Sequence, residues 1–358
     1  MKKCIPTLLI IIILAAAFCY VKFYRARNKT IATIEKVTDY SDYNLYTMGV
    51  RYDYDIDRIV SRGITDTESC LDAIVKEAFP LIPIKVEVPS FGCSAFTMKC
   101  ADGTVLMGRN YDFKLNTSAM MVRCAPTKGY KSIAFCALDN ISADDALKNN
   151  KTKLACLTAP FVCLDGVNEK GVSIAVLTLD SEPTVQHNDK PAIGTTLAIR
   201  LVLDRAATTA EAVELLSEYD MVSVNGRDSH FYITDATGDG RVIEYDPLSE
   251  DRKMIVTPSD AITNFYACYK DNVLPNQHNG IYGHGLERYN RILDVFAKYD
   301  GNLSEEAAWT ALTAASQVPN PDEVTSNTQW SIVFSNTNAT AKIALRRDWG
   351  NVNFFSVK

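Results

Sequence analysis

One cysteine, Cys93, directly follows a glycine at the start of a strand–turn–strand pattern, in the run PSFGCSAFTMKCADGTVLMGRNYDFK. Arg109 and Asp112 stand near the end of the same pattern. A thiolate is a strong nucleophile, an arginine stabilises it over the thiol, and a carboxylate can orient groups that exchange protons with it. These residue types therefore indicate nucleophilic catalysis. The alternative is a buried structural thiol beside a local ion pair between Arg109 and Asp112.

The glycine before this cysteine suggests a place where the chain cuts itself. Attack of the Cys93 thiol on the Gly92 carbonyl needs a close approach, and glycine has no side chain to obstruct it. Cleavage between Gly92 and Cys93 would free an α-amino group with a pKa of about 8, within reach of its own side chain. Cys93 would then hold both nucleophile and base, so catalysis would need none of the histidines, which are His187, His230, His278 and His284.

The elements that must position these groups are mostly strands. A hairpin with an Asp-Gly turn is predicted over CSAFTMKC and TVLMGRNYDF, and eight further strand patterns follow it. Helical patterns come in two pairs, TTLAIRLVLDRA with TTAEAVELLSEY and LERYNRILDVFAKY with SEEAAWTALTAAS. Because strands and helices are grouped and do not alternate as βαβ units, we expect an α+β fold of antiparallel sheets with helices packed outside.

Several stretches together resemble the N-terminal-nucleophile (Ntn) hydrolases of the choloylglycine hydrolase type. That family includes bile salt hydrolases, penicillin V acylase and the C45-type acyltransferases that act on 6-aminopenicillanate. The resemblance covers about residues 88 to 350 and implies a four-layer αββα sandwich of two antiparallel sheets. The stretches that carry it are Gly92-Cys93, Gly108-Arg109-Asn110-Tyr111-Asp112, DGVNEKG from Asp165, Ile262-Thr263-Asn264-Phe265, Glu287-Arg288-Tyr289 and Thr328-Gln329-Trp330-Ser331.

Carried over residue by residue, the resemblance implies Cys93 as nucleophile and its freed amine as base. Arg109 and Asp112 would tune and orient that pair. Asn264 would donate from its side-chain amide to the oxyanion of the tetrahedral intermediate, and Arg288 would support the site electrostatically. Taken alone, Asn264 fits a turn residue and Arg288 a solvated helix residue.

Two departures from the family pattern bear on the substrate. Thr178 stands where the bile salt hydrolases have an asparagine, so one oxyanion donor is a hydroxyl, a backbone N–H, or absent. The bile acid enzymes begin nearly at their cysteine, whereas 92 residues precede it here, which is more like the acyltransferase branch and the more distant acid ceramidase branch. No Cys or His spacing suggests a metal site, and we expect no cofactor.

The first residues of the chain predict a targeting segment. An uncharged apolar run from Ile5 to Val21 is flanked by basic residues on both sides and spans about 25 Å as a helix. We therefore expect residues 1–29 to be a membrane anchor or signal peptide, residues 30–92 a pro-segment and residues 93–358 one Ntn-hydrolase catalytic domain. The protein would be membrane-anchored or secreted, with an extracytoplasmic catalytic domain.

The predicted function is a cysteine Ntn amidase that hydrolyses linear, non-peptide C–N amide bonds through a thioester on Cys93. One alternative is an acyltransferase that passes the acyl group to an amine. Another is a catalytically inactive surface binding protein of the same fold. The expected partners are a small N-acyl substrate, the membrane and possible further copies of the chain. A net charge of −6 argues against nucleic acid.

Overall fold

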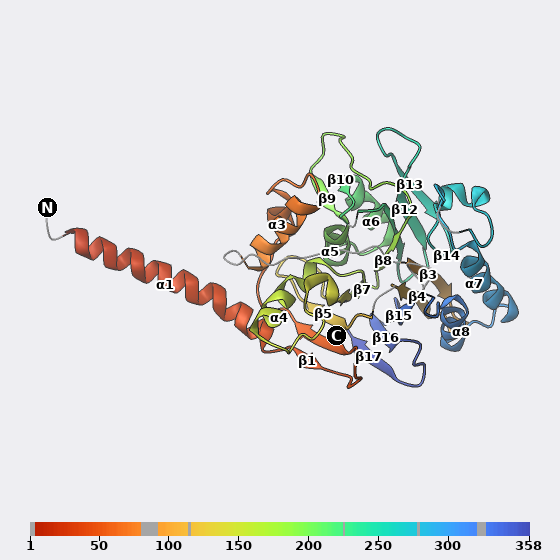
Figure 1. Cartoon of the computed structure of the whole chain (residues 1–358), viewed down its shortest axis with the longest axis horizontal. Coiled ribbons are helices and arrows are strands. Elements are labelled where there is room, and N and C mark those ends of the chain that lie inside the picture. Colours follow the sequence, from red (N-terminus) through yellow and green to blue (C-terminus); the bar gives the residue numbers. More distant parts are fainter. Residues whose placement is uncertain (1–3, 80–91, 114–115, 225, 278–279, 321–326) are drawn as a thin grey trace.

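The computed structural model describes residues 4–79, 92–113, 116–224, 226–277, 280–320 and 327–358. Two large sheets lie against each other, and helices cover their outer faces (Figure 1). The predicted α+β class with an αββα sandwich is therefore confirmed. One of the histidines named above, His278, lies outside the described residues.

The larger sheet has nine strands in the order β1-β2-β5-β6-β7-β8-β11-β12-β13. Its neighbours pair antiparallel except β2 and β5, which are parallel. A separate parallel pair joins β9 and β10. The bounds are β1 Glu35–Lys36, β2 Leu45–Gly49, β5 Ala119–Cys124, β6 Ser132–Ala137, β7 Asp165–Asn168, β8 Ser173–Thr178, β9 Ala192–Gly194, β10 Asp220–Val222, β11 Ser229–Thr234, β12 Arg241–Tyr245 and β13 Met254–Pro258.

The smaller sheet has six strands in the order β14-β3-β4-β15-β16-β17 and is antiparallel throughout. Its bounds are β14 Ala261–Ile262, β3 Gly92–Lys99, β4 Val105–Asp112, β15 Thr328–Ser335, β16 Thr340–Leu345 and β17 Val352–Ser356. Aromatic rings fill the space between the sheets. The ring centroid of Phe135 in β6 lies 6.1 Å from that of Phe334 in β15 and 6.2 Å from that of Phe355 in β17.

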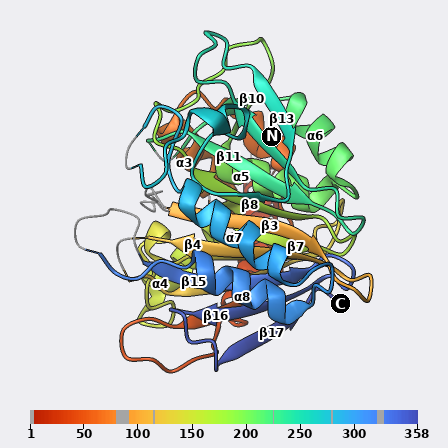
Figure 2. The ribbon, with the colours of Figure 1, turned by 90° about the vertical axis from the view of Figure 1, so that its right-hand side faces the viewer.

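The four helices predicted in pairs form the outer layers. On the larger sheet, α5 (Thr195–Arg205) packs against β7 and β8 and is followed by α6 (Thr209–Ser217). On the smaller sheet, α7 (Leu286–Lys298) packs against β14 and β3, and α8 (Glu305–Ala315) against β4 and β15 (Figure 2). The shorter helices are α4 Asn150–Ala155, η1 Asp139–Ile141, η2 Cys156–Phe161 and η3 Ala267–Asn272.

The N-terminal part of the chain is built into the same body. It comprises α1 (Cys4–Ile31), β1, β2, α2 (Ile56–Val60) and α3 (Thr67–Ala78). Arg27 near the end of α1 is buried and donates to the carbonyls of Glu77 and Ala78, so α1 holds the last turn of α3. The segment predicted as a pro-segment also supplies two strands of the larger sheet, β1 and β2, and its removal stays a prediction.

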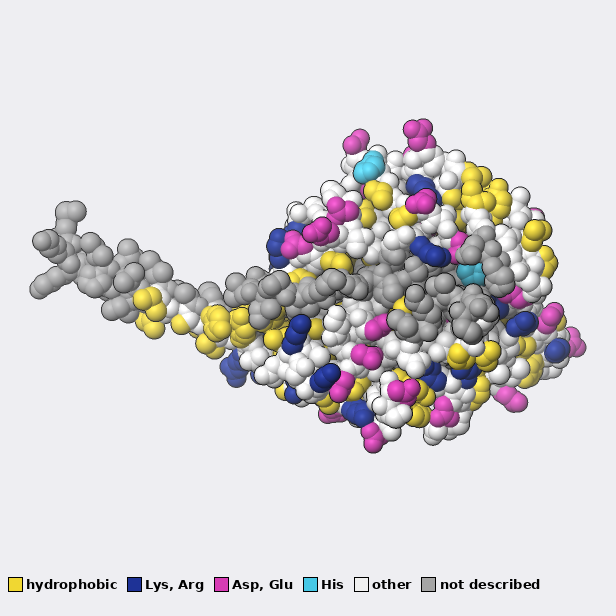
Figure 3. All heavy atoms as spheres, viewed as in Figure 1, with side chains coloured by type: hydrophobic (Ala, Val, Ile, Leu, Met, Phe, Trp, Pro, Cys, Tyr) yellow, Lys and Arg dark blue, Asp and Glu magenta, His cyan; other side chains and the backbone are white. Residues whose placement is uncertain are grey.

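The structure gives no support to the predicted transmembrane segment. Among the residues that it describes, no helix is long and apolar enough to cross a membrane. On the visible face of the rounded part of the molecule, basic and acidic side chains are interspersed (Figure 3).

Candidate active site

The hairpin of β3 and β4 sets which face each candidate residue occupies. Cys93 pairs with Tyr111 and Ala95 with Arg109, so Cys93, Arg109 and Tyr111 share one face. That face looks into the sandwich, because Arg109 contacts Asp165 and Val176 of the larger sheet. The predicted Asp-Gly turn closes the hairpin, and Gly103 has φ 87°, which favours glycine.

Asp112 lies on the opposite face, toward the helices. Its neighbour two positions back, Asn110, donates from Nδ2 to the carbonyl of Leu312 in α8 at 2.9 Å. The local ion pair that the sequence left open between Arg109 and Asp112 is therefore not the arrangement formed. Arg109 pairs with Asp165, and Asp112 pairs with Arg288.

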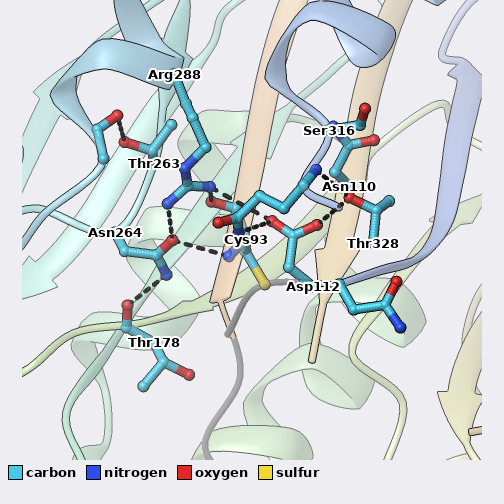
Figure 4. A network of polar contacts seen from close by, with 12 residues as sticks. Cys93, Asn110, Asp112, Thr178, Thr263, Asn264, Arg288, Ser316 and Thr328 are labelled. Carbon is cyan, nitrogen blue, oxygen red and sulfur yellow. Dashed lines mark hydrogen bonds and ion pairs between the residues drawn. The ribbon is translucent and has the colours of Figure 1, made fainter. Parts of the chain in front are cut away.

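Both backbone groups of Cys93 are held by side chains from distant parts of the chain. The Cys93 N–H donates to Oδ1 of Asn264 at 2.8 Å, and its carbonyl accepts from Nη1 of Arg288 at 2.8 Å (Figure 4). Two donors converge on the same Asn264 oxygen, since Nη2 of Arg288 also donates to it at 2.8 Å. The side-chain amide is therefore oriented with its oxygen toward the cysteine.

Arg288 is buried and connects most of the site. Besides its contacts with Cys93 and Asn264, its Nη1 lies 3.4 Å from Oδ2 of Asp112. The residue is in the first turn of α7, which Gly285 precedes with φ 87°. A Cβ on Gly285 would lie 2.5 Å from Nη2 of Arg288, so only glycine allows both this backbone and this approach. Arg288 is therefore buried among the candidate site residues and is not a solvated helix residue.

Two donors to Asp112 were not predicted from the sequence. Thr328 donates from Oγ1 to Oδ1 at 2.6 Å, and Gln317 donates from Nε2 to Oδ2 at 2.8 Å. Thr328 belongs to a stretch that carried the family resemblance. That resemblance indicated that Thr328 lies near the site but did not indicate its contact with Asp112. Gln317 follows α8 in a segment with no such signal, and only the fold brings it to Asp112.

Arg109 is fully buried with three described polar contacts. Its Nε lies 3.3 Å from Oδ2 of Asp165, its Nη1 donates to the carbonyl of Asn110 at 2.7 Å, and its Nη2 donates to that of Val176 at 2.8 Å. Asp165 was noted in the sequence only as part of a motif. The first four residues of that motif form strand β7, and the Asp165 carboxylate faces the smaller sheet.

Burial controls the ionisation of the thiol. Cys93 is fully buried, and burial raises the pKa of its thiol to about 11, while the nearby Arg109 guanidinium acts in the opposite direction. Burial likewise raises the pKa of Asp165 to about 6, against the effect of Arg109. In the uncut chain the thiol is therefore protonated at neutral pH and shielded from solvent.

Thr178 takes part in the site through its backbone. Its carbonyl accepts from Nδ2 of Asn264 at 2.7 Å, at the end of β8. This contact uses one of the two hydrogens of the Asn264 amide and leaves the other for an oxyanion. In the part of the chain that is described, no group of three or more His, Cys, Asp or Glu side chains is placed to hold a metal ion.

Comparisons with known proteins agree with this geometry. The family described as linear amide C–N hydrolases, choloylglycine hydrolase family, matches residues 93–256. Over these residues the chain resembles this family. It is accordingly a hydrolase that acts on carbon–nitrogen bonds other than peptide bonds, as the sequence predicted. The match begins at Cys93.

Two solved structures have the same fold. A conjugated bile acid hydrolase from Clostridium perfringens superposes with a TM-score of 0.54 at 16% identity, covering 74% of this chain and 92% of that one. Penicillin V acylase from Agrobacterium tumefaciens superposes with a TM-score of 0.53 at 18% identity, covering 74% and 86%. At these identities the likeness concerns the fold, and the choice of substrate needs its own argument.

Proposed function

We propose that the chain is the precursor of a cysteine amidase that cuts itself between Gly92 and Cys93. The observation that supports the proposal is the set of contacts that Cys93 makes. Its N–H is held by Asn264 and its carbonyl by Arg288, and its thiol lies beside the Arg109 cation. A thiol that only fills the core needs no such set of partners.

In the cut, the Cys93 sulfur attacks the Gly92 carbonyl carbon. The C–N bond breaks as the C–S bond forms, and the departing nitrogen takes the thiol proton. Water then hydrolyses the thioester, which leaves a carboxylate on Gly92 and restores the thiol. The new α-amine stands where the peptide N–H stood, so the Asn264 oxygen that accepts from it in the precursor also orients the base.

Turnover repeats this chemistry on a linear amide. The α-amine accepts the thiol proton, sulfur attacks the substrate carbonyl, and the oxyanion accepts a hydrogen bond from the remaining N–H of the Asn264 amide. The leaving amine takes the proton from the α-ammonium, and water hydrolyses the resulting thioester on Cys93. Arg109 favours the thiolate, and Arg288 holds Asp112, Asn264 and the Cys93 carbonyl in one arrangement.

The N-terminal fragment stays bound after the cut in this proposal. Strand β2 pairs with β5 over five positions, and the Tyr52 hydroxyl donates to the carbonyl of Leu157 at 2.5 Å. Loss of the fragment would expose the edge of β5 and the core residues beneath it. Active enzyme should therefore purify as two fragments that separate only on denaturation.

The test is purification of the full chain followed by gel analysis under denaturing conditions. Edman sequencing of the larger fragment should begin Cys-Ser-Ala-Phe, and Cys93→Ala should remain intact. Intact wild-type protein that still hydrolyses amides would overturn the proposal. Products formed with an added amine separate hydrolysis from acyl transfer. A thiol that reacts with no electrophile in either form would favour the inactive binding protein.

We also keep the targeting role of residues 1–29 as a proposal. It is supported by the uncharged run from Ile5 to Val21 with basic flanks. Fractionation of cells that express the full chain, with a protease added outside, tests it. Protection of the catalytic part from the protease would contradict an extracytoplasmic location.

A further inference from the structure

Asp165 is a buried carboxylate near the nucleophile that the proposed chemistry does not use. It lies in β7 of the larger sheet, yet its Oδ2 faces two donors of the smaller sheet, Nε of Arg109 at 3.3 Å and Nε1 of Trp330 at 3.5 Å. Among the described residues its other oxygen, Oδ1, has no hydrogen-bond partner. The carboxylate therefore links the two sheets through Arg109 and Trp330.

Stability alone gives little reason for a carboxylate in this position. Burial of a charge with one unpaired oxygen is costly, and the raised pKa of Asp165, about 6, reflects that cost. Apolar side chains in place of both Asp165 and Arg109 would fill the same space without it. The benefit must come from what the carboxylate does to its neighbours.

Its closest charged neighbour is the arginine that acts on the thiol. The backbone carbonyls of Asn110 and Val176 hold Nη1 and Nη2 of Arg109, and Asp165 faces Nε. The guanidinium is thus fixed at three points. Its Cζ also lies 5.9 Å from the centre of the Tyr111 ring, which pairs in register with Cys93.

We propose that Asp165 is a positioning residue of the amidase, which fixes the Arg109 guanidinium beside the Cys93 thiol and sets how much of its positive charge the thiol experiences. This inference rests on the proposed function. An ionised Asp165 offsets part of the Arg109 charge, so its removal leaves more cation to stabilise the thiolate. Loss of the oxygen, by contrast, frees the guanidinium to move, and small displacements of a catalytic group lower the rate strongly.

Other ionisable groups share this environment. Those that interact with Asp165 or with the thiol are Arg109 and Tyr111 of β4, Cys136 of β6 and, for the thiol, Asp112. The experiment therefore compares variants at Asp165 itself and does not assign one inflection of a pH profile to one residue.

The experiment uses the processed enzyme and measures kcat and KM. It also measures, by mass spectrometry and as a function of pH, the rate at which iodoacetamide alkylates Cys93. Asp165→Ala should lower kcat roughly a hundredfold with KM nearly unchanged, because the guanidinium moves. Asp165→Asn keeps an oxygen for Arg109 and should recover most of kcat. It should also lower the pKa of Cys93 alkylation by about one unit.

A second buried pair supplies the matched control. Arg200 and Asp204 lie 2.8 Å apart, both buried and outside the site, so Asp204→Asn removes a comparable charge. It should leave the Cys93 alkylation profile unchanged. Identical profiles for Asp165→Asn and Asp204→Asn, or full kcat in Asp165→Ala, would overturn the inference.

Two further outcomes remain decisive. If Asp165→Ala and Asp165→Asn do not fold, Trp330→Phe removes one donor to Asp165 and should shift the Cys93 profile in the same direction by less, whereas an unshifted profile overturns the inference. If wild type neither splits nor hydrolyses an amide, the proposed function fails. The alkylation profiles of Asp165→Asn and Asp204→Asn in the uncut chain still decide the role of Asp165.

Discussion

Two cysteines lie at opposite ends of strand β3, and the charged side chains around them have opposite signs. Cys93 near its start has the Arg109 cation as its main charged neighbour, and Arg288 on its carbonyl. Cys100 directly after its end has acidic neighbours, Asp102 and Glu305, which add to burial in raising its thiol pKa. Both thiols are largely buried, so burial does not distinguish a nucleophile from a structural thiol.

The two ends of the strand also differ in what surrounds the thiol. The Cys93 end is closed by Asn264 from the segment after β14, Arg288 from α7 and Gln317 from the segment after α8. The Cys100 end borders a cavity of about 590 Å³ whose polar lining includes the paired Lys342 and Glu305, 2.8 Å apart. A fixed cation and directed hydrogen bonds, more than residue type or burial, make the first end suited to catalysis.

The largest expected effect separates the two thiols directly. Cys93→Ala should abolish both the cut and amide hydrolysis, a loss of at least about a thousandfold, because nucleophile and base are removed together. Cys100→Ala should leave both within about threefold, since no step uses that thiol. Denaturing gels and amide turnover measure the two variants. Comparable activity in the two variants would show that Cys93 is not the nucleophile.

The second effect concerns the asparagines near each end. Asn264→Ala should lower kcat by roughly a hundredfold to a thousandfold, as it removes an oxyanion donor and the acceptor for the cysteine nitrogen. Asn338→Ala, in the lining of the distant cavity, should have no measurable effect on kcat. Steady-state kinetics on one amide test both. If the two variants have equal kcat values, Asn264 has no role in catalysis.

The third effect is a pH dependence of the cut. Burial raises the pKa of the Cys93 thiol in the uncut chain to about 11. Below that pH, each rise of one pH unit therefore makes the reactive thiolate about tenfold more abundant. Fragment appearance after cell-free synthesis should therefore accelerate as pH rises from 7 toward 9. A single new N-terminus at Cys93, and none at Cys100, should accompany it. A rate independent of pH would contradict attack by the thiolate.

The smallest effect tests the two ends of β15. Thr328 at its start donates to Asp112, and Ser335 at its end lies by the cavity. Thr328→Val leaves a buried carboxylate oxygen without its donor and should lower kcat about tenfold. Ser335→Ala should change it little. If stability falls without any change in kcat, Thr328 serves the fold and not the site.

Much of the fold was predictable because local patterns agree with it. The amphipathic helix patterns became α5, α6, α7 and α8, and the Asp-Gly turn closed the hairpin that carries Cys93. Strands β2 and β17 were not predicted. Each has only five residues, and β2 is held by a parallel partner far away in sequence, which no local pattern reveals.

By itself the sequence predicted Cys93 as the nucleophile, Gly92 as the residue before the cut and the residue types around them, since strand alternation and turn chemistry are local properties. Only the tertiary structure decided how the charges pair. The hairpin sends Arg109 and Asp112 to opposite faces, so each finds a partner from another element, Asp165 and Arg288. Such pairings depend on how sheets and helices pack at long range, where electrostatic contacts are set by three-dimensional proximity and not by spacing along the chain.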